Sequence, residues 1–336
     1  MFRSFTLATL LFAIPCSALA DDWTFDKDAA ALRPLSCIGD TASPDRITVQ
    51  VEDVALGETE YLPERVSFLR GWALSSEDWR FGGLSGLAVT DDGSLLTVSD
   101  MGRALRFNIP EDGAISALVW DLRRANGRSL TGKLTGDAEG LTLEDGLAFV
   151  SFERDFRVLA YDMKGCGAAA RGIPIAEFPA RYGKTRIRAN AGPESLELTK
   201  NGKLRIGFEQ PLESAILTGL VERSGAIRFE TVHEEGKLLQ FFRHVGADTV
   251  TLEDGRIATA RLLRAYDRRL GNRSILDIQV GEDQDRISLE PPQAVDNFEG
   301  IALTETDSGV RAFIVSDDNF SDRQRTLLFA FDLRLD

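Results

Sequence analysis

Acidic residues recur along the chain at nearly constant spacing, each just before an apolar segment. Four of the five such positions hold a carboxylic acid, and the positions are Ser85, Glu139, Glu194, Asp248 and Glu299. Carboxylates that converge repel one another unless a cation offsets their charge or some of them stay protonated. Calcium prefers oxygen ligands and accepts about six to eight of them. The spacing therefore predicts a calcium site with Glu139, Glu194 and Glu299 as ligands.

A different role is open to each of these acids, since a carboxylate can also accept backbone N–H bonds in a tight turn. A second set of polar residues follows the next apolar segment of each repeat, namely Asp100, Glu153, Glu209 and Asp317. For Glu153 and its neighbour Arg154 we favour a salt bridge that stabilises the fold. Asp317, Asp318 and Asn319 place three oxygen-bearing side chains in one loop. This pattern suits a metal or phosphate-water site, and it is also typical of an ordinary turn.

Basic residues are dense in one segment only, just before Glu194. They are Arg181, Lys184, Arg186 and Arg188. If that loop faces the carboxylates, it could hold a phosphate or carboxylate beside a metal. A Ser-His-Asp triad would have to use His233 or His244, and the chain has no Gly-x-Gly-x-x-Gly or P-loop motif.

The acidic positions belong to a repeat of 51 to 55 residues. Each repeat continues with an alternating apolar strand, a polar turn that ends in glycine, and a second apolar strand. The turns Asp92-Gly93, Asp145-Gly146, Asn201-Gly202 and Asp254-Gly255 suit tight hairpins. Two more strands fit before the next repeat, and four antiparallel strands per unit are typical of a propeller blade. We predict an all-β protein, a single β-propeller of five or six blades. Only Glu234–Val245 could form a short helix or an ordered loop.

Closure of the ring should involve both ends of the chain. Arg46–Asp53 and Arg65–Leu74 are the clear strands before Ser85, and an N-terminal strand should join the blade that holds Leu327–Leu335. Closure removes open sheet edges. The first strand of each blade lines the central channel, so the acids at its start are expected at one mouth of the channel.

The N-terminal residues predict export. Arg3, an apolar run and Ala18-Leu19-Ala20 are typical of a signal peptide at 1–20. An N-terminal extension at 21–45 and the propeller domain at 46–336 then follow. Cys37 and Cys166 are the only cysteines outside the leader, so in an oxidising compartment we expect them to form a disulfide. We expect a periplasmic or secreted protein.

The charge of the chain limits its partners. Acidic residues outnumber basic ones, and the formal net charge is −14. Such a surface repels nucleic acid and anionic membranes, and no later segment is long and apolar enough to span a bilayer. We expect a monomer that binds a small ester or phosphoester and no nucleic acid.

Several motifs resemble those of the phytase-like family, described as "esterase-like activity of phytase". The matching segments are Phe81–Leu87 with Val98–Arg103, Asp137–Gly140 with Ser151–Arg154, Asn190 with Pro193–Leu196, and Asn297–Ile301 with Val315–Phe320. The resemblance runs from about Arg65 to the C-terminus. It implies an exported propeller with a phosphoester or carboxylester hydrolase role. It also implies the functional positions Asp137, Glu139, Glu194, Glu299, Asp317 and Asn319.

These observations lead to one main hypothesis and one alternative. The main hypothesis is a calcium-assisted ester or phosphoester hydrolase that acts at the mouth of the channel. Glu139, Glu194 and Asp317 are its expected catalytic residues, and the expected substrate-binding residues are Asp137, Asn319, Arg103 and Arg188. The alternative is a non-catalytic propeller that binds a small ligand or a protein partner on the same face.

Overall fold

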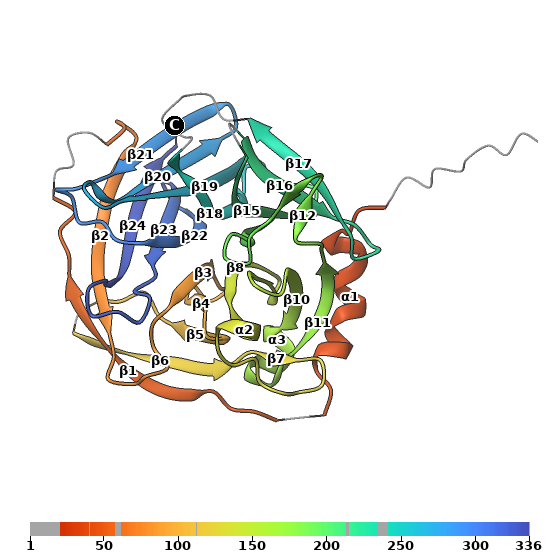
Figure 1. The fold of residues 1–336 in the computed structure, drawn as a ribbon. Coiled ribbons are helices and arrows are strands. Elements are labelled where there is room, and N and C mark those ends of the chain that lie inside the picture. Colours follow the sequence, from red (N-terminus) through yellow and green to blue (C-terminus); the bar gives the residue numbers. More distant parts are fainter. Residues whose placement is uncertain are drawn as a thin grey trace, which may run out of the picture.

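The computed structural model describes residues 21–39, 41–57, 62–111, 113–212, 215–233 and 241–335. The predicted signal peptide lies outside the described residues. In the described part, strands pair into sets of four around a central axis, and the fold is a β-propeller (Figure 1).

The strands form five sets, which we number as blades 1 to 5 in chain order from their inner strands. Blade 1 is β3 (Leu84–Val89), β4 (Leu95–Ser99), β5 (Arg103–Phe107) and β6 (Ala114–Asp121). Blade 2 is β8 (Ala138–Glu144), β9 (Leu147–Phe152), β10 (Arg157–Asp162) and β11 (Arg171–Glu177). Blade 3 is β14 (Pro193–Leu198), β15 (Leu204–Leu212), β16 (Ala215–Val221) and β17 (Ile227–His233). Blade 4 is β18 (Arg243–Thr251), β19 (Ile257–Asp267), β20 (Gly271–Val280) and β21 (Asp283–Leu289). Blade 5 is β22 (Phe298–Thr306), β23 (Gly309–Ser316), β24 (Thr326–Arg334) and β2 (Val66–Ser75).

The ring closes as the sequence predicted. The N-terminal strand β2 pairs antiparallel with the C-terminal strand β24 and completes blade 5. β1 (Asp45–Asp53) pairs with β2 on one side and with β6 on the other, so it links blades 5 and 1 at the periphery. The inner strands β3, β8, β14, β18 and β22 contact one another in a closed cycle.

Each inner strand has an irregular register at the position that reaches the channel mouth. In blade 5 the register shifts between Phe298 and Gly300, so Glu299 lies outside the regular ladder. A bulge of this kind redirects a side chain. The following residue must be small, because a Cβ at Gly300 would lie 2.0 Å from the Ser85 carbonyl oxygen of the next inner strand.

This register corrects one prediction about blade 4. The shift in β18 lies between His244 and Gly246, so the residue equivalent to Glu299 is Val245. Asp248 lies three residues further along and faces the opposite end of the channel. The sequence pattern was misleading because Asp248 precedes an apolar segment just as the glutamates do.

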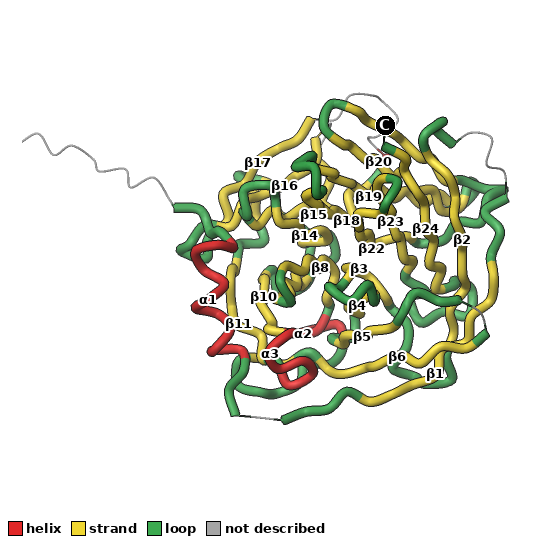
Figure 2. Tube along the Cα trace, turned by 180° about the vertical axis from the view of Figure 1, so that it is seen from behind, coloured by secondary structure: helices red, strands yellow, loops and turns green. Residues whose placement is uncertain are grey.

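The N-terminal extension contains a helix that the sequence analysis missed. α1 (Phe25–Ser36) packs on β10 and β11 of blade 2 (Figure 2). Asp26 and Asp28 lie in its first turn and Arg33 in its last, an arrangement that favours the helix dipole. The predicted helix at 234–245 is described only at its last five residues, and 243–245 belong to β18.

The expected disulfide is present. Cys37 and Cys166 are bonded, with 5.5 Å between their Cα atoms. The bond ties the end of α1 to α3 (Met163–Cys166) between β10 and β11. The Trp23 ring also packs edge-on against Phe149, with 5.0 Å between centroids, so the extension is part of the core of blades 2 and 3.

The remaining described elements are short. They are β7 (Arg123–Arg124), α2 (Lys133–Gly136), a 3-10 turn (Gly167–Ala169), β12 (Arg181–Tyr182) and β13 (Thr185–Arg186). No helix in the described ranges is long and apolar enough to cross a bilayer.

Candidate functional site

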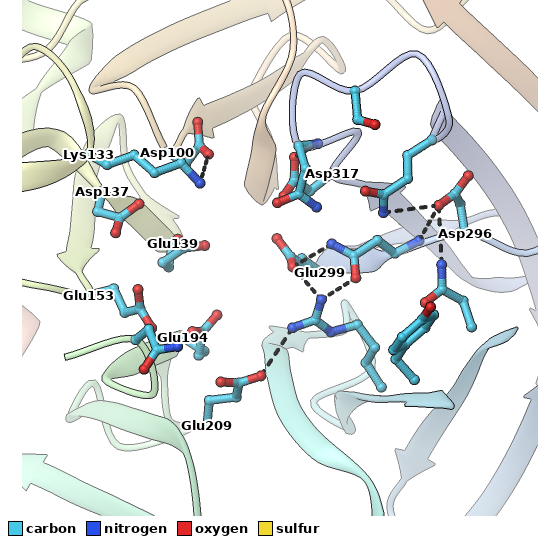
Figure 3. A pocket seen from close by; sticks show the side chains of 18 of the residues that line it. Asp100, Lys133, Asp137, Glu139, Glu153, Glu194, Glu209, Asp296, Glu299 and Asp317 are labelled. Atoms are coloured by element: carbon cyan, nitrogen blue, oxygen red, sulfur yellow. Dashed lines mark hydrogen bonds and ion pairs between the residues drawn. The ribbon is translucent and has the colours of Figure 1, made fainter. Parts of the chain in front are cut away.

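A polar pocket of about 830 Å³ lies at the mouth of the channel where the inner strands begin (Figure 3). Its charged lining is mostly acidic. The acids are Asp100, Asp137, Glu139, Glu153, Glu194, Glu209, Asp296, Glu299 and Asp317, and the bases are Lys133, Arg154, Arg264 and Arg323.

Two positions of the blade repeat supply most of these carboxylates. The bulge of the inner strand supplies Glu139, Glu194 and Glu299. The second strand, or the residue just after it, supplies Asp100, Glu153, Glu209 and Asp317. The pocket is therefore a direct product of the repeat: the same two backbone positions converge from successive blades.

One side of the pocket, from blades 2 and 3, gathers carboxylates closely. Oxygen atoms of Asp137, Glu139 and Glu153 lie within 4.8 Å of one another, and so do those of Glu153, Glu194 and Glu209. We call these five residues the acidic wall. Glu153 belongs to both groups and joins them.

The acidic wall shows the electrostatic cost of this arrangement. Burial, and then the Glu299 carboxylate, raise the pKa of Glu139 well above its ordinary value. Burial and then Glu139 have the same effect on the pKa of Glu194. Burial and the Asp137 charge raise the pKa of Glu153 to about 8. A cation bound here would offset both the energetic cost of burying these carboxylates and their mutual repulsion.

The opposite side, from blades 4 and 5, neutralises its carboxylate with a fixed cation. Arg264 Nη1 lies 2.8 Å from Glu299 Oε1, and the side chain of Asn297 donates to the same oxygen at 2.9 Å. Arg264 Nη1 also donates to Asn297 Oδ1. Burial would lower the pKa of Arg264, but the carboxylates of Glu299 and Glu209 raise it. We call Arg264, Asn297 and Glu299 the paired wall.

Arg264 also touches the edge of the acidic wall. Its Nη2 lies 3.1 Å from Glu209 Oε1. Arg264 comes from the second strand of blade 4, the blade whose inner strand carries Val245 in place of a carboxylate. Blade 4 therefore contributes a positive charge where the other blades contribute negative ones.

Two further bases approach the pocket from the side of blades 1 and 2. Lys133 Nζ lies 2.6 Å from Asp100 Oδ2, and Arg154 Nε donates to Asp137 Oδ2 at 2.5 Å. The expected pairing of Arg154 with Glu153 is replaced by this pairing with Asp137. Burial raises the pKa of Asp100 even though Lys133 is close.

The loop after β23 divides its polar residues between pocket and scaffold. Asp317 lines the pocket, and its Oδ1 accepts from the Asn319 N–H at 2.6 Å. Burial and the Glu299 charge raise the pKa of Asp317 well above its ordinary value. Asp318 turns away and accepts from the Gly83 N–H at 2.9 Å, so it fastens the loop to blade 1.

Six of the expected site residues line the pocket, and they are Asp137, Glu139, Glu194, Glu299, Asp317 and Asn319. Arg103 and Arg188 lie outside the lining residues that the structure describes. Arg103 is buried under Trp79, with its guanidinium 4.4 Å from the ring centre. Arg188 is exposed, and its backbone N–H donates to Gln210 Oε1.

Of the four bases that line the pocket, the sequence pointed only to Arg154, as a salt-bridge residue, and not to Lys133, Arg264 or Arg323. Lys133 lies four residues before Asp137, and this short separation could have indicated that Lys133 is near the site. Arg264 lies where the second strand of blade 4 matches Asp317 in blade 5, so the repeat offered a signal for it once the register was known. Arg323 gave none, because it lies outside the repeated positions.

The other end of the channel opens into a second cavity, of about 760 Å³. There Asp248 Oδ2 accepts from the Leu303 N–H at 2.7 Å and Oδ1 from Thr249 N–H at 2.8 Å. For Asp248 the alternative interpretation therefore holds: its carboxylate caps backbone donors between blades 4 and 5.

Comparison with known families supports the motif resemblance. The model of the phytase-like family, described as esterase-like activity of phytase, matches residues 79–216. The resemblance is confirmed over that segment. The matched segment contains all five residues of the acidic wall, and the residues of the paired wall lie after it in the chain. No curated protein matches the sequence.

Solved structures with some similarity include propellers of several kinds. The PQQ-bound aldose sugar dehydrogenase of Streptomyces coelicolor is 11% identical, with 81% of this chain and 99% of that chain covered and a TM-score of 0.40. A protein of unknown function from Dyadobacter fermentans is 11% identical, with 87% and 95% covered and a TM-score of 0.40. The WD40 β-propeller domain of Doa1 is 10% identical, with 76% and 94% covered and a TM-score of 0.36. Similarity at this level carries no information about function.

Proposed function

We propose, from the phytase-like match and the geometry of the pocket, that this chain is a divalent-cation-dependent hydrolase of esters or phosphoesters. The observation that carries the proposal is the acidic wall, in which two groups of three carboxylates share Glu153. These residues come from the segment that matches the family.

The acidic wall fits a hard cation. All its donors are carboxylate oxygens, and neither histidine nor cysteine occurs among the described lining residues. This donor set suits calcium, which takes oxygen ligands in flexible geometry. We propose Asp137, Glu139, Glu153, Glu194 and Glu209 as the residues that hold it. Glu299 was also expected as a ligand, but its ion pair with Arg264 makes it a weaker candidate.

A cation bound at the acidic wall would supply positive charge that polarises the ester oxygen. The chain's own bases then complete the binding of an anionic group. Lys133 and Arg154 extend from blades 1 and 2, and Arg323 extends from the loop of blade 5. Arg154 is about one third exposed, so its guanidinium can reach a bound phosphate or carboxylate.

Asp317 is our candidate for the general base. Burial and the Glu299 charge raise the pKa of Asp317, which makes its carboxylate a stronger base toward water than an ordinary aspartate. In the proposed reaction, water oxygen bonds to the phosphorus or the carbonyl carbon, and the bond to the leaving oxygen breaks. Asp317 accepts a proton from that water and then passes it to the leaving oxygen, so its carboxylate is regenerated.

The test is a panel of chromogenic ester and phosphoester substrates, assayed with calcium and with a chelator. We expect hydrolysis that depends on calcium and falls at least tenfold in Glu153→Gln and Asp317→Asn. Arg188→Ser is the matched control, because Arg188 lies outside the lining. Activity that ignores the chelator, or survives in both variants, would contradict the proposal.

The excess of carboxylates over bases also favours a second candidate, a non-catalytic propeller that binds a cationic ligand. This candidate predicts calcium binding, or binding of a small amine, with no turnover of any substrate in the panel.

We further propose that the protein is exported. The signal-peptide pattern at 1–20 and the disulfide between Cys37 and Cys166 support this location. N-terminal sequencing of the protein from the periplasm or medium should begin at Asp21, and an intact Met1 would contradict the proposal.

A further inference from the structure

A buried arginine in blade 1 lacks the partners that buried arginines usually have. Arg103 begins β5 and is 4% exposed. Its Nε is fully buried and has no hydrogen-bond partner. In the described part of the chain its one ion-pair partner is Asp121, and the distance from Nε to Asp121 Oδ1 is 3.9 Å, too long for a hydrogen bond. The charge of the guanidinium is therefore poorly compensated.

Arg264 shows how the same fold surrounds an arginine that serves the structure. The guanidinium of Arg264 contacts Glu299, Glu209 and Asn297. The Arg103 side chain is buried more deeply, 5% exposed against 19%, yet its guanidinium has no hydrogen bond within the described ranges. Because a buried charge without hydrogen bonds is costly, the N–H groups of Arg103 should attract an oxyanion.

An aromatic ring covers this guanidinium. The ring centre of Trp79 lies 4.4 Å from Arg103 Cζ, which is a cation–π contact. Trp79 is itself 73% exposed, so most of the indole faces solvent while it rests on a buried charge. The indole has no hydrogen-bond acceptor to offer the guanidinium N–H groups. Trp79 therefore covers Arg103 without pairing its donors.

The turn that carries Trp79 is held on both sides of that residue. Arg80 Nε and Nη2 donate to the two carboxylate oxygens of Asp78 at 2.9 and 2.8 Å. The Phe81 N–H donates to the Asp78 carbonyl oxygen at 3.0 Å. These bonds fix the backbone on either side of Trp79 and do not involve its side chain. The indole can therefore change rotamer while the turn stays in place.

The guanidinium lies beside the acidic pocket but outside it. Arg103 pairs with Ser99 across β4 and β5, and the residue after Ser99 is Asp100, which lines the pocket. Burial lowers the pKa of Arg103, whereas the charges of Asp121 and, more weakly, Asp100 raise it, so the pocket wall is within electrostatic reach. Neither Arg103 nor Trp79 is among the described lining residues.

We propose that Arg103 and Trp79 form an oxyanion-binding site separate from the pocket: the indole moves aside, and the guanidinium binds a carboxylate or phosphate group. A guanidinium presents paired N–H groups that match two oxygens of such a group. The inference does not depend on the proposed hydrolase, because neither residue holds the cation there. It gives Arg103, which the sequence indicated as a binding residue, a site of its own.

The test measures binding of inorganic phosphate and of acetate by calorimetry and by tryptophan fluorescence. The protein is first freed of metal on a chelating resin, and the ionic strength is held constant. We expect at least one probe to bind and to change the acrylamide quenching of Trp79, the one exposed tryptophan in the described chain. A response to acetate alone identifies a carboxylate ligand, and a response to phosphate alone identifies a phosphate.

Two variants test the parts of the site. Arg103→Met should weaken binding at least tenfold. Without anion, its thermal midpoint should be unchanged or higher, because an apolar side chain replaces a poorly paired buried charge. Trp79→Ala should tighten binding about threefold, because the ligand no longer displaces the ring from its cation–π contact.

Two further variants are controls. Arg106→Met removes an arginine of the same strand that is already paired with Asp92, and it should leave binding unchanged. Trp79→Phe keeps an aromatic cover, so it should abolish the fluorescence response and retain the calorimetric one. A fluorescence response that persists in Trp79→Phe would show that another tryptophan reports the binding, and it would contradict the proposed movement.

Three other results would overturn the proposal. The first is no binding of phosphate or acetate by the unmodified protein. The second is binding that survives in Arg103→Met and is lost in Arg154→Met, which would place the anion in the pocket. The third is a lower thermal midpoint of Arg103→Met without anion, which would mean that the fold already stabilises this guanidinium.

Discussion

The two sides of the pocket handle the same electrostatic problem in different ways. On the acidic wall, Glu139 and Glu194 extend from inner-strand bulges toward other carboxylates, and burial and repulsion raise their pKa values. On the paired wall, Glu299 extends from the equivalent bulge but meets Arg264 at 2.8 Å. The fold places the three glutamates alike, so the difference comes from Arg264 in the second strand of the preceding blade.

This difference indicates which side of the pocket is prepared for a ligand. A paired buried carboxylate is already neutralised and serves the structure. The acidic wall has five carboxylates, and only Asp137 and Glu209 are paired with bases, Arg154 and Arg264. The repulsion that remains is unfavourable energy that a bound cation can release. The match to the phytase-like family covers the acidic wall and ends before the residues of the paired wall.

The largest expected effect on stability comes from removing the disulfide. It tests whether the brace on blade 2 acts independently of the charges in the pocket. The disulfide and α1 brace blade 2, behind the acidic wall. Replacing both Cys37 and Cys166 by serine should lower the free energy of unfolding by roughly 4–5 kcal/mol, the chain-entropy value for a long loop. Denaturant unfolding measures this loss. The calcium-induced rise in thermal midpoint should be unchanged, and a lost calcium response would mean that the brace also shapes the site.

The next effect tests the paired wall. Arg264→Met leaves the buried Glu299 and the half-buried Glu209 without their cation, and it should lower the free energy of unfolding by about 3–5 kcal/mol in chelator. Calcium should recover part of this loss, because the freed carboxylates can then bind it.

Arg154→Met is the control for that experiment. Asp137 is buried but Arg154 is about one third exposed, so solvent screens this ion pair and we expect a smaller loss, of about 1–2 kcal/mol. Equal losses in the two variants would remove the distinction between the walls.

The folded state should lose stability in acid because of His244, which precedes Val245 in blade 4. Burial lowers the pKa of His244 to about 3, with a smaller contribution from the Arg261 charge. The imidazole Nδ1 lies 3.3 Å from Ser195 Oγ. Because the unfolded chain binds this proton below about pH 6.5 and the folded chain does not, stability is retained above that pH and is lost as pH falls toward 3.

The loss from His244 should approach about 1.4 kcal/mol per pH unit between pH 6 and 4. His244→Asn cannot take up the proton and should flatten this limb of the stability curve. Denaturant unfolding at several pH values in chelator measures both slopes, and identical slopes would show that His244 is not the responsible group.

The smallest expected effect concerns the basic loop. Arg188→Ser should change stability by less than about 0.5 kcal/mol and leave calcium binding intact, because Arg188 is exposed and outside the described lining. A clear loss of calcium-dependent activity in this variant would restore the sequence prediction that Arg188 binds the substrate.

Much of the fold could be predicted because the repeated residues meet local requirements of the backbone. Hairpins such as Asp145-Gly146 need positive φ, and the structure has φ values of 43° and 71° there. The Glu-Gly pair at Glu299 combines a bulge with a close approach between inner strands. These requirements are visible as residue types at fixed spacing.

The rest depended on contacts between distant parts of the chain. Arg264 reaches Glu299 from another blade through a long side chain, and no spacing rule fixes that distance. Val245 replaces an acid at an inner bulge, so the repeat pointed to Asp248 instead. α1 is stabilised by packing on blade 2, and its short sequence pattern was too weak to predict it.

Calcium titration by calorimetry tests the central claim most directly, on the unmodified protein, Glu153→Gln and Glu299→Gln. The first variant removes the carboxylate that both acidic groups share, and the second removes the one held by Arg264. The account predicts that the unmodified protein binds calcium, that Glu153→Gln weakens binding at least tenfold, about 1.4 kcal/mol, and that Glu299→Gln changes it by less than about threefold, under 1 kcal/mol. No binding by the unmodified protein, or a loss of affinity in Glu299→Gln with none in Glu153→Gln, would contradict it.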